Sequence, residues 1–181
     1  MRDGEGKPED YSRVTDPGRF AVLHEVAEQL LDDLTAQFMV ERRESKEPIG
    51  SQLYRTVRLV PRTPAAAPLA VSFTDFPSVI LRFGRWYEES LPGCGCDACD
   101  EQPDDLIADF RTQVSALVEG GLWERVRRGV GGSWSEVRLI GLDIQRGRET
   151  PLDAAAARAA RREGFAAAVQ WGPWPRRSSS S

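Results

Sequence analysis

The sequence contains no asparagine, one histidine (His24) and only two lysines among its 181 residues. Without asparagine it has no N-glycosylation site. The motifs G-x-S-x-G and H-E-x-x-H and a phosphate-binding glycine loop are also missing, so the sequence assigns no catalytic residue. No apolar run approaches the roughly 18 to 20 residues of a membrane span, and residues 1–7 are not an apolar signal segment. We therefore expect a cytoplasmic protein that does not enter a membrane.

Arginine supplies 22 of the 24 basic side chains, a bias typical of a GC-rich bacterial genome. The arginines are therefore weak evidence for phosphate recognition. Residues 1–124 carry 13 basic and 23 acidic side chains, a net −10, whereas residues 125–181 carry 11 and 5, a net +6. This asymmetry indicates either a basic surface for an anionic partner or two halves that attract each other in the folded domain, and we favour the second.

The length suits one domain, which we place at residues 16–170, between a flexible arm (1–15) and a tail (171–181) with a disordered end. Asp16 and Pro17 are typical of a helix start. From there one apolar stripe at helical spacing predicts an amphipathic helix that reaches Phe38. Its members are Phe20, Leu23, Ala27, Leu30, Leu31, Leu34 and Phe38.

Further along, apolar residues alternate in three short segments, around residues 57–59, 69–73 and 79–83, which predicts an antiparallel meander. A second helix is expected from Pro103 to the Gly120-Gly121 pair, because Asp104 and Asp105 suit a first turn. A fourth strand is expected at 134–142 and a last helix from Pro151 to about Val169. The order predicts an α+β fold: a small, mainly antiparallel sheet of about four strands with about three helices packed on it.

All three cysteines lie within six residues, Cys94-Gly95-Cys96-Asp97-Ala98-Cys99, between a strand and a helix start. Thiolates bind zinc strongly, and the glycines let the backbone fold so that the sulfurs converge on one ion. Tetrahedral zinc needs a fourth ligand, for which His24 is one candidate. Asp97, Asp100 and Glu101 are nearer in sequence and equally suitable. The loop therefore predicts a structural zinc site; the sequence indicates no other cofactor.

Two other interpretations of the loop remain open. Cys96 and Cys99 form a C-x-x-C pair before a helix, the spacing of thioredoxin-like redox proteins. The surrounding carboxylates argue against this interpretation, because negative charge raises the pKa of a thiol. The same negative charge would stabilise a bound cation and so support the metal site. The third interpretation is a surface loop with free thiols and no functional role.

The last third of the chain is basic and partly aromatic, which suggests a nucleic-acid-binding module as a less favoured alternative. We expect Trp123 and Trp134 to lie in the core, and Trp171 and Trp174 to fasten the tail to the domain. The acidic isoelectric point, about 5.2, also argues against nucleic acid.

Two consecutive segments resemble the signature of an uncharacterised family of small actinobacterial proteins, a domain of unknown function. They are Phe83-Gly84-Arg85-Trp86-Tyr87-Glu88-Glu89 and Leu91-Pro92-Gly93-Cys94-Gly95-Cys96-Asp97-Ala98-Cys99-Asp100-Glu101. The resemblance covers about residues 10–165. It implies a bacterial cytoplasmic setting and makes the loop a family feature, and it implies no activity or ligand role. We therefore expect a non-enzymatic interaction or regulatory domain whose protein partner is unknown.

Overall fold

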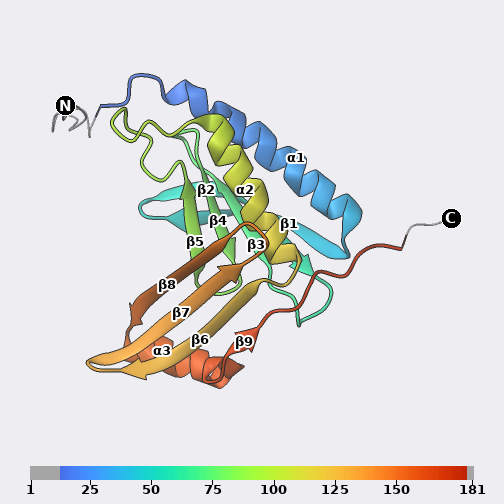
Figure 1. Cartoon of the computed structure of the whole chain (residues 1–181), viewed down its shortest axis with the longest axis vertical. Coiled ribbons are helices and arrows are strands. Elements are labelled where there is room, and N and C mark those ends of the chain that lie inside the picture. Colours follow the sequence, from blue (N-terminus) through green and yellow to red (C-terminus); the bar gives the residue numbers. More distant parts are fainter. Residues whose placement is uncertain (1–12, 179–181) are drawn as a thin grey trace.

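The computed structural model describes residues 13–178 and has an α+β fold of two antiparallel sheets and three α-helices (Figure 1), which confirms the expected fold class. The elements in chain order are α1 (Val22–Gln37), β1 (Val40–Ile49), β2 (Gln52–Pro61), β3 (Leu69–Phe73), β4 (Val79–Phe83), β5 (Tyr87–Leu91), α2 (Pro103–Val118), β6 (Leu122–Gly129), β7 (Gly132–Ile140), β8 (Gln145–Leu152), α3 (Ala154–Ala160) and β9 (Val169–Gln170). Most of the expected N-terminal arm, residues 1–12, and the serines at 179–181 lie outside the described residues. None of the described helices is both long and apolar enough to span a membrane.

The first sheet is a meander in the order β1-β2-β3-β4-β5, and α1 and α2 lie side by side across one of its faces (Figure 1). Apolar residues at alternate positions of the strands form the buried face of this sheet. Val57, Val71 and Leu81 are aligned across three strands and are completely buried. The apolar stripe of α1 packs on the same face and buries Leu23 and Leu31. The three expected strands of this region are therefore confirmed.

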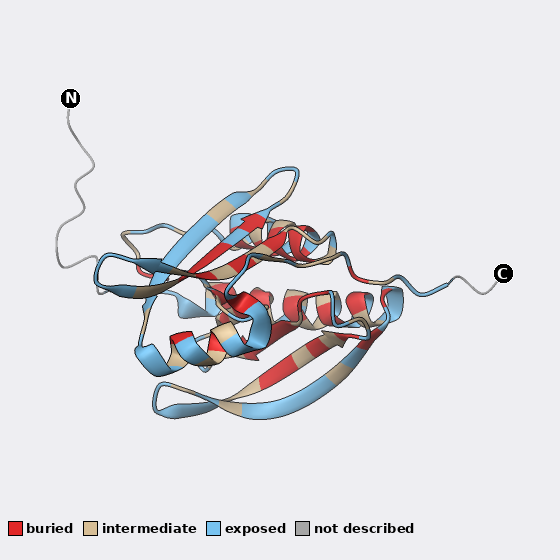
Figure 2. Ribbon diagram, turned by 90° about the horizontal axis from the view of Figure 1, so that it is seen from below, coloured by how far each residue is buried: buried red, intermediate tan, exposed pale blue. Residues whose placement is uncertain are grey.

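The second sheet has four strands in the order β8-β7-β6-β9. Together with the five strands of the first sheet, the described residues hold more strands than the four or so expected. One face of this sheet contributes Leu122, Val137 and Leu139 to the main core, and a smaller core forms around Val126 beneath α3. Figure 2 shows buried positions gathered where the helices and sheets face one another. The last helix is expected from Pro151 to about Val169, but Pro151 lies in β8 and α3 ends at Ala160. A π-helical turn continues it over Arg161–Phe165, where Gly164 adopts a φ of 100° and ends the helical segment.

The turn from α2 into β6 explains why two glycines follow each other there. Gly120 has a φ of 85°, a conformation that suits glycine. A Cβ atom on Gly121 would lie 1.9 Å from the carbonyl oxygen of Ile140. The expected helix stop is therefore confirmed, and it also sets the close approach of α2 to β7.

A buried carboxylate joins the two sheets. Glu124, on β6, is fully buried, and its oxygens accept hydrogen bonds from the backbone N–H groups of Arg85 and Trp86 in the turn between β4 and β5 (2.8 to 3.1 Å). The indole N–H of Trp171 donates a further bond at 2.8 Å. Since a buried polar group without a partner is costly, this carboxylate fixes the turn, the second sheet and the C-terminal segment together.

Replacing Glu124 by alanine should destabilise the fold by roughly 3 kcal/mol or more, because three donors lose their buried acceptor and each unsatisfied group costs about 1 to 3 kcal/mol. Urea denaturation measures the change in the free energy of unfolding. Glu149→Ala is the matched control, since that carboxylate is half exposed and pairs with Arg127 at the surface; its cost should stay below about 1 kcal/mol. Equal effects of the two substitutions would contradict this role.

The same carboxylate should make stability depend on pH. Burial raises the pKa of Glu124 above its ordinary value of 4.5 by more than the hydrogen bonds from Trp86, Trp171 and Arg85 lower it. The native state therefore holds this proton more tightly than the unfolded chain does, and its contribution is full below pH 4.5 and is lost as the pH rises through the native pKa. Relative to the non-titrating Glu124→Gln variant, the wild type should lose stability in urea titrations as the pH rises above 4.5. A constant or opposite difference would refute the assignment.

Candidate metal centre

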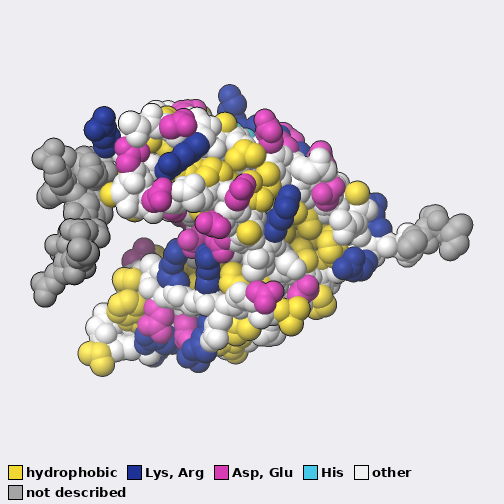
Figure 3. All heavy atoms as spheres, turned by 45° about the horizontal axis from the view of Figure 1, so that its top comes forward, with side chains coloured by type: hydrophobic (Ala, Val, Ile, Leu, Met, Phe, Trp, Pro, Cys, Tyr) yellow, Lys and Arg dark blue, Asp and Glu magenta, His cyan; other side chains and the backbone are white. Residues whose placement is uncertain are grey.

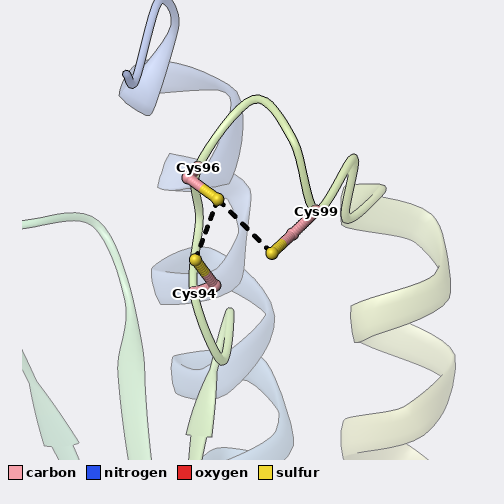
Figure 4. Close-up of side chains that lie close together, drawn as sticks. All are labelled: Cys94, Cys96 and Cys99. Carbon is pink, nitrogen blue, oxygen red and sulfur yellow. Dashed lines mark hydrogen bonds between the residues drawn. The ribbon is translucent and has the colours of Figure 1, made fainter. Parts of the chain in front are cut away.

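The cysteine loop connects the end of β5 to the start of α2 (Figure 4). Cys94 and Cys96 follow β5, and Cys99 precedes α2 by four residues, so the three side chains approach one another from the two limbs of the loop. The helix begins at Pro103, where proline suits the first position, and carries Asp104 and Asp105 in its first turn. The loop thus closes the gap between the first sheet and the helix that covers it.

Glu101 holds the first limb of the loop in place. Its carboxylate accepts hydrogen bonds from three consecutive backbone N–H groups, those of Gly93 (2.9 Å), Cys94 (3.0 Å) and Gly95 (2.9 Å). Partial burial would raise the pKa of this carboxyl, but the three backbone bonds outweigh it and place the pKa below its ordinary value. The carboxylate is therefore a structural part of the loop at neutral pH.

Asp97 anchors the top of the loop to the segment before α1. Its carboxylate accepts bonds from the backbone N–H of Thr15 (3.0 Å) and from the Thr15 hydroxyl (2.5 Å), and these bonds lower its pKa. The backbone N–H of Asp97 donates to the carbonyl of Arg13 at 2.9 Å. The loop is therefore fixed at two points by carboxylates whose oxygens bind main-chain donors.

The three sulfurs converge. The Sγ of Cys96 lies 2.9 Å from that of Cys94 and 3.3 Å from that of Cys99, and all three lie within 4.8 Å of one another (Figure 4). A tetrahedral zinc ion with bonds of about 2.3 Å separates its sulfur ligands by about 3.8 Å, so only small side-chain shifts would be needed. Cys96 is buried, whereas Cys94 and Cys99 are exposed. This spacing suits a metal ion or a transient disulfide.

Electrostatics within the cluster favours one thiolate at a time. Hydrogen bonds with Cys94 and Cys99 lower the pKa of Cys96, while the hydrogen bond with Cys96 raises the pKa of Cys99 to about 12. A second and third thiolate would repel the first. A bound cation removes that penalty, and binding would then release protons.

The other four residues expected as ligands are not gathered with the sulfurs in the described part of the chain. Asp97 and Glu101 bind main-chain donors, as described above. The ring Nε2 of His24 lies 3.0 Å from the carbonyl oxygen of Ser78, and its ring meets Phe73 edge-on at 5.3 Å. Asp100 accepts a bond from the Gln102 amide at 2.7 Å.

One charged residue near the loop was not anticipated from the sequence. The positive charge of Arg19 acts on both Asp97 and Glu101, and two of its guanidinium nitrogens, Nε and Nη2, are buried without a hydrogen-bond partner among the described residues. Its guanidinium carbon lies 4.7 Å from the centre of the Phe20 ring. Arg19 precedes α1 by three residues, and nothing in its local sequence pattern points to the cysteines.

Part of the basic charge of the C-terminal third is paired with acidic side chains. Arg125 and Arg138 both bind Glu136 (2.7 and 2.8 Å), and Figure 3 shows acidic and basic side chains interspersed over the face in view. The expectation that Trp123 and Trp134 lie in the core is wrong. Both are only partly buried and lie beneath arginine side chains, with Arg125 and Arg138 each about 5 Å from the Trp123 ring centre (5.1 and 5.4 Å).

If Glu101 holds the loop, Glu101→Ala should expose the buried Cys96. Its thiol should then react with Ellman's reagent at least several-fold faster in metal-free protein, because three backbone donors lose their acceptor and the first limb opens. Asp100→Asn is the control, since that carboxylate binds the neighbouring Gln102 and asparagine tolerates the φ of 45° at this position. Equal reaction rates in the two variants would show that Glu101 does not shape the loop.

Comparison with known proteins gives a family and no activity. Neither a curated protein nor a solved structure matches the chain. A family model described as a family of unknown function (DUF6226) matches residues 1–178, which includes every described element and the whole cysteine loop. The chain therefore belongs to this family of unknown function, DUF6226.

Proposed function

We propose that the domain is a non-enzymatic interaction or regulatory module in which Cys94, Cys96 and Cys99 bind a structural zinc ion. The observation that carries this proposal is the convergence of three sulfurs within 4.8 Å on a loop whose backbone is already fixed. The bacterial cytoplasm implied by the sequence resemblance fits the proposal, because thiols stay reduced there and are available to metals.

The ion would add a link between two elements that already pack on one core. Cys94 belongs to the limb that leaves β5 and Cys99 to the limb that enters α2, so one ion would fasten the sheet to the helix that covers it. Binding free energy of a structural ion adds to the free energy of folding. The carboxylates that fix the loop would leave little ordering for the metal to impose, which favours binding.

A thiol–disulfide oxidoreductase that uses Cys96 and Cys99 is the second candidate. The 3.3 Å between their sulfurs favours it, since only a modest movement separates this contact from a disulfide of about 2.05 Å. The objection from negative charge stands, because Asp97 and Glu101 stay ionised while they bind N–H groups and so still disfavour a thiolate nearby. The oxidoreductase function requires a disulfide that forms reversibly, and zinc binding would prevent this disulfide from forming.

Purified, untagged protein should contain one zinc ion per chain, measured by native mass spectrometry and elemental analysis of the same sample. Its three thiols should be protected from titration until a chelator is added. Cys96→Ser should lose the metal and lower the thermal unfolding midpoint, whereas His24→Ala should keep the metal, because the His24 ring binds the Ser78 carbonyl.

A folded, metal-free protein with three freely titrating thiols would contradict the zinc proposal. If the same sample then formed a Cys96–Cys99 disulfide reversibly, the result would favour the oxidoreductase. If the thiols reacted without forming that disulfide, neither function would survive.

A further inference from the structure

We propose that the fourth ligand of the metal is a thiolate, which comes from outside this chain because the sequence holds only the three cysteines of the loop. The inference rests on the proposed zinc site and names the chemistry of its remaining position. Three protein ligands with one open position is the arrangement that lets a zinc ion exchange its fourth ligand, whereas closed structural sites have four protein ligands.

Among the described residues, the two nearby carboxylates Glu101 and Asp97 already accept hydrogen bonds that hold the loop. Recruiting Glu101 would strip the acceptor from three backbone N–H groups and so release the limb that carries Cys94 and Cys96. Recruiting Asp97 would release both bonds from Thr15 at the other anchor. Each move would undo the geometry that brings the sulfurs together, and the lost acceptors would cost about 1 to 3 kcal/mol per group where they stay buried.

His24 and Asp100 make fewer hydrogen bonds and are not grouped with the three sulfurs. His24 packs against Phe73 and binds the Ser78 carbonyl in the turn before β4. Asp100 has a φ of 45°, and its carboxylate binds the Gln102 amide at the entrance to α2. Among the described residues, only the three cysteines form a group that suits a metal.

The open position is reachable from solvent. Cys96 is 3% exposed and forms the inner wall of the cluster, while Cys94 and Cys99 are exposed. A metal held among the three sulfurs would therefore have the protein on the Cys96 side and solvent on the other. An incoming sulfur would replace a metal-bound water, and the thiol proton would pass to the buffer.

Softness and charge favour a thiolate over a hard anion. Three thiolates already make the site soft, and such sites prefer zinc or copper(I) and further sulfur. Zinc with four thiolates carries a net charge of −2, which needs a nearby cation. Arg19 is the candidate cation, since its charge acts on the loop carboxylates Asp97 and Glu101 and two of its buried nitrogens have no partner among the described residues.

The protein loaded with Co²⁺ in thiol-free buffer tests this inference. Titration with 2-mercaptoethanol should raise the sulfur-to-cobalt charge-transfer absorbance saturably by about a third, because four sulfurs instead of three then bind the ion. A short peptide with one cysteine forms the second arm. Equal affinity for both probes indicates a free small thiol as the ligand, and a tighter peptide indicates a cysteine of a partner protein.

Two variants make the result decisive. His24→Ala should respond to the thiol as the wild type does, whereas Arg19→Gln should bind it several-fold more weakly while retaining Co²⁺. Unchanged absorbance on thiol addition, with Co²⁺ bound one to one, would overturn the external ligand and leave the zinc proposal intact. Failure to bind Co²⁺ or zinc at all would instead overturn the zinc proposal itself.

Discussion

The candidate site depends on the three hydrogen bonds that the Glu101 carboxylate accepts from consecutive backbone N–H groups. A short loop with two glycines has a high conformational entropy, and nothing in its own side chains would bring three sulfurs together. The carboxylate supplies that constraint from the entrance of α2. Asp97 supplies a second constraint from the opposite side through Thr15, so the cysteines are positioned without relying on a metal.

The rest of the fold gives this loop a rigid base. Both ends of the loop belong to ordered elements, β5 and α2, which lie over one core with α1. At the other end of the first sheet, Glu124 joins the β4–β5 turn to the second sheet and to Trp171. Two carboxylates that bind backbone donors thus fix both ends of the β4–β5 hairpin: the buried Glu124 at the turn, and the partly buried Glu101 at the candidate site.

Sequence periodicity predicted the α+β class, both long helices and the strands β2, β3, β4 and β7. It missed β1 and β8 because the inward and outward positions of these edge strands are mostly polar and exposed, so they lack an apolar period. It missed β6 because the buried Glu124 interrupts the apolar face between Leu122 and Val126, and it missed the short strands β5 and β9. It placed Trp123 in the core because residue type does not show which face of β6 an aromatic side chain occupies. The cysteine cluster could be predicted from spacing. The engagement of Asp97 and Glu101 by the backbone could not, because it depends on tertiary contacts.

The central claim is that three cysteine sulfurs of this chain hold one metal ion. X-ray absorption at the zinc edge of the zinc-loaded protein, prepared without added thiols, tests it most directly because the technique counts and identifies the ligand atoms. The account predicts three sulfur neighbours at about 2.3 Å and one lighter neighbour at about 2.0 Å. A shell of nitrogen and oxygen alone would contradict it.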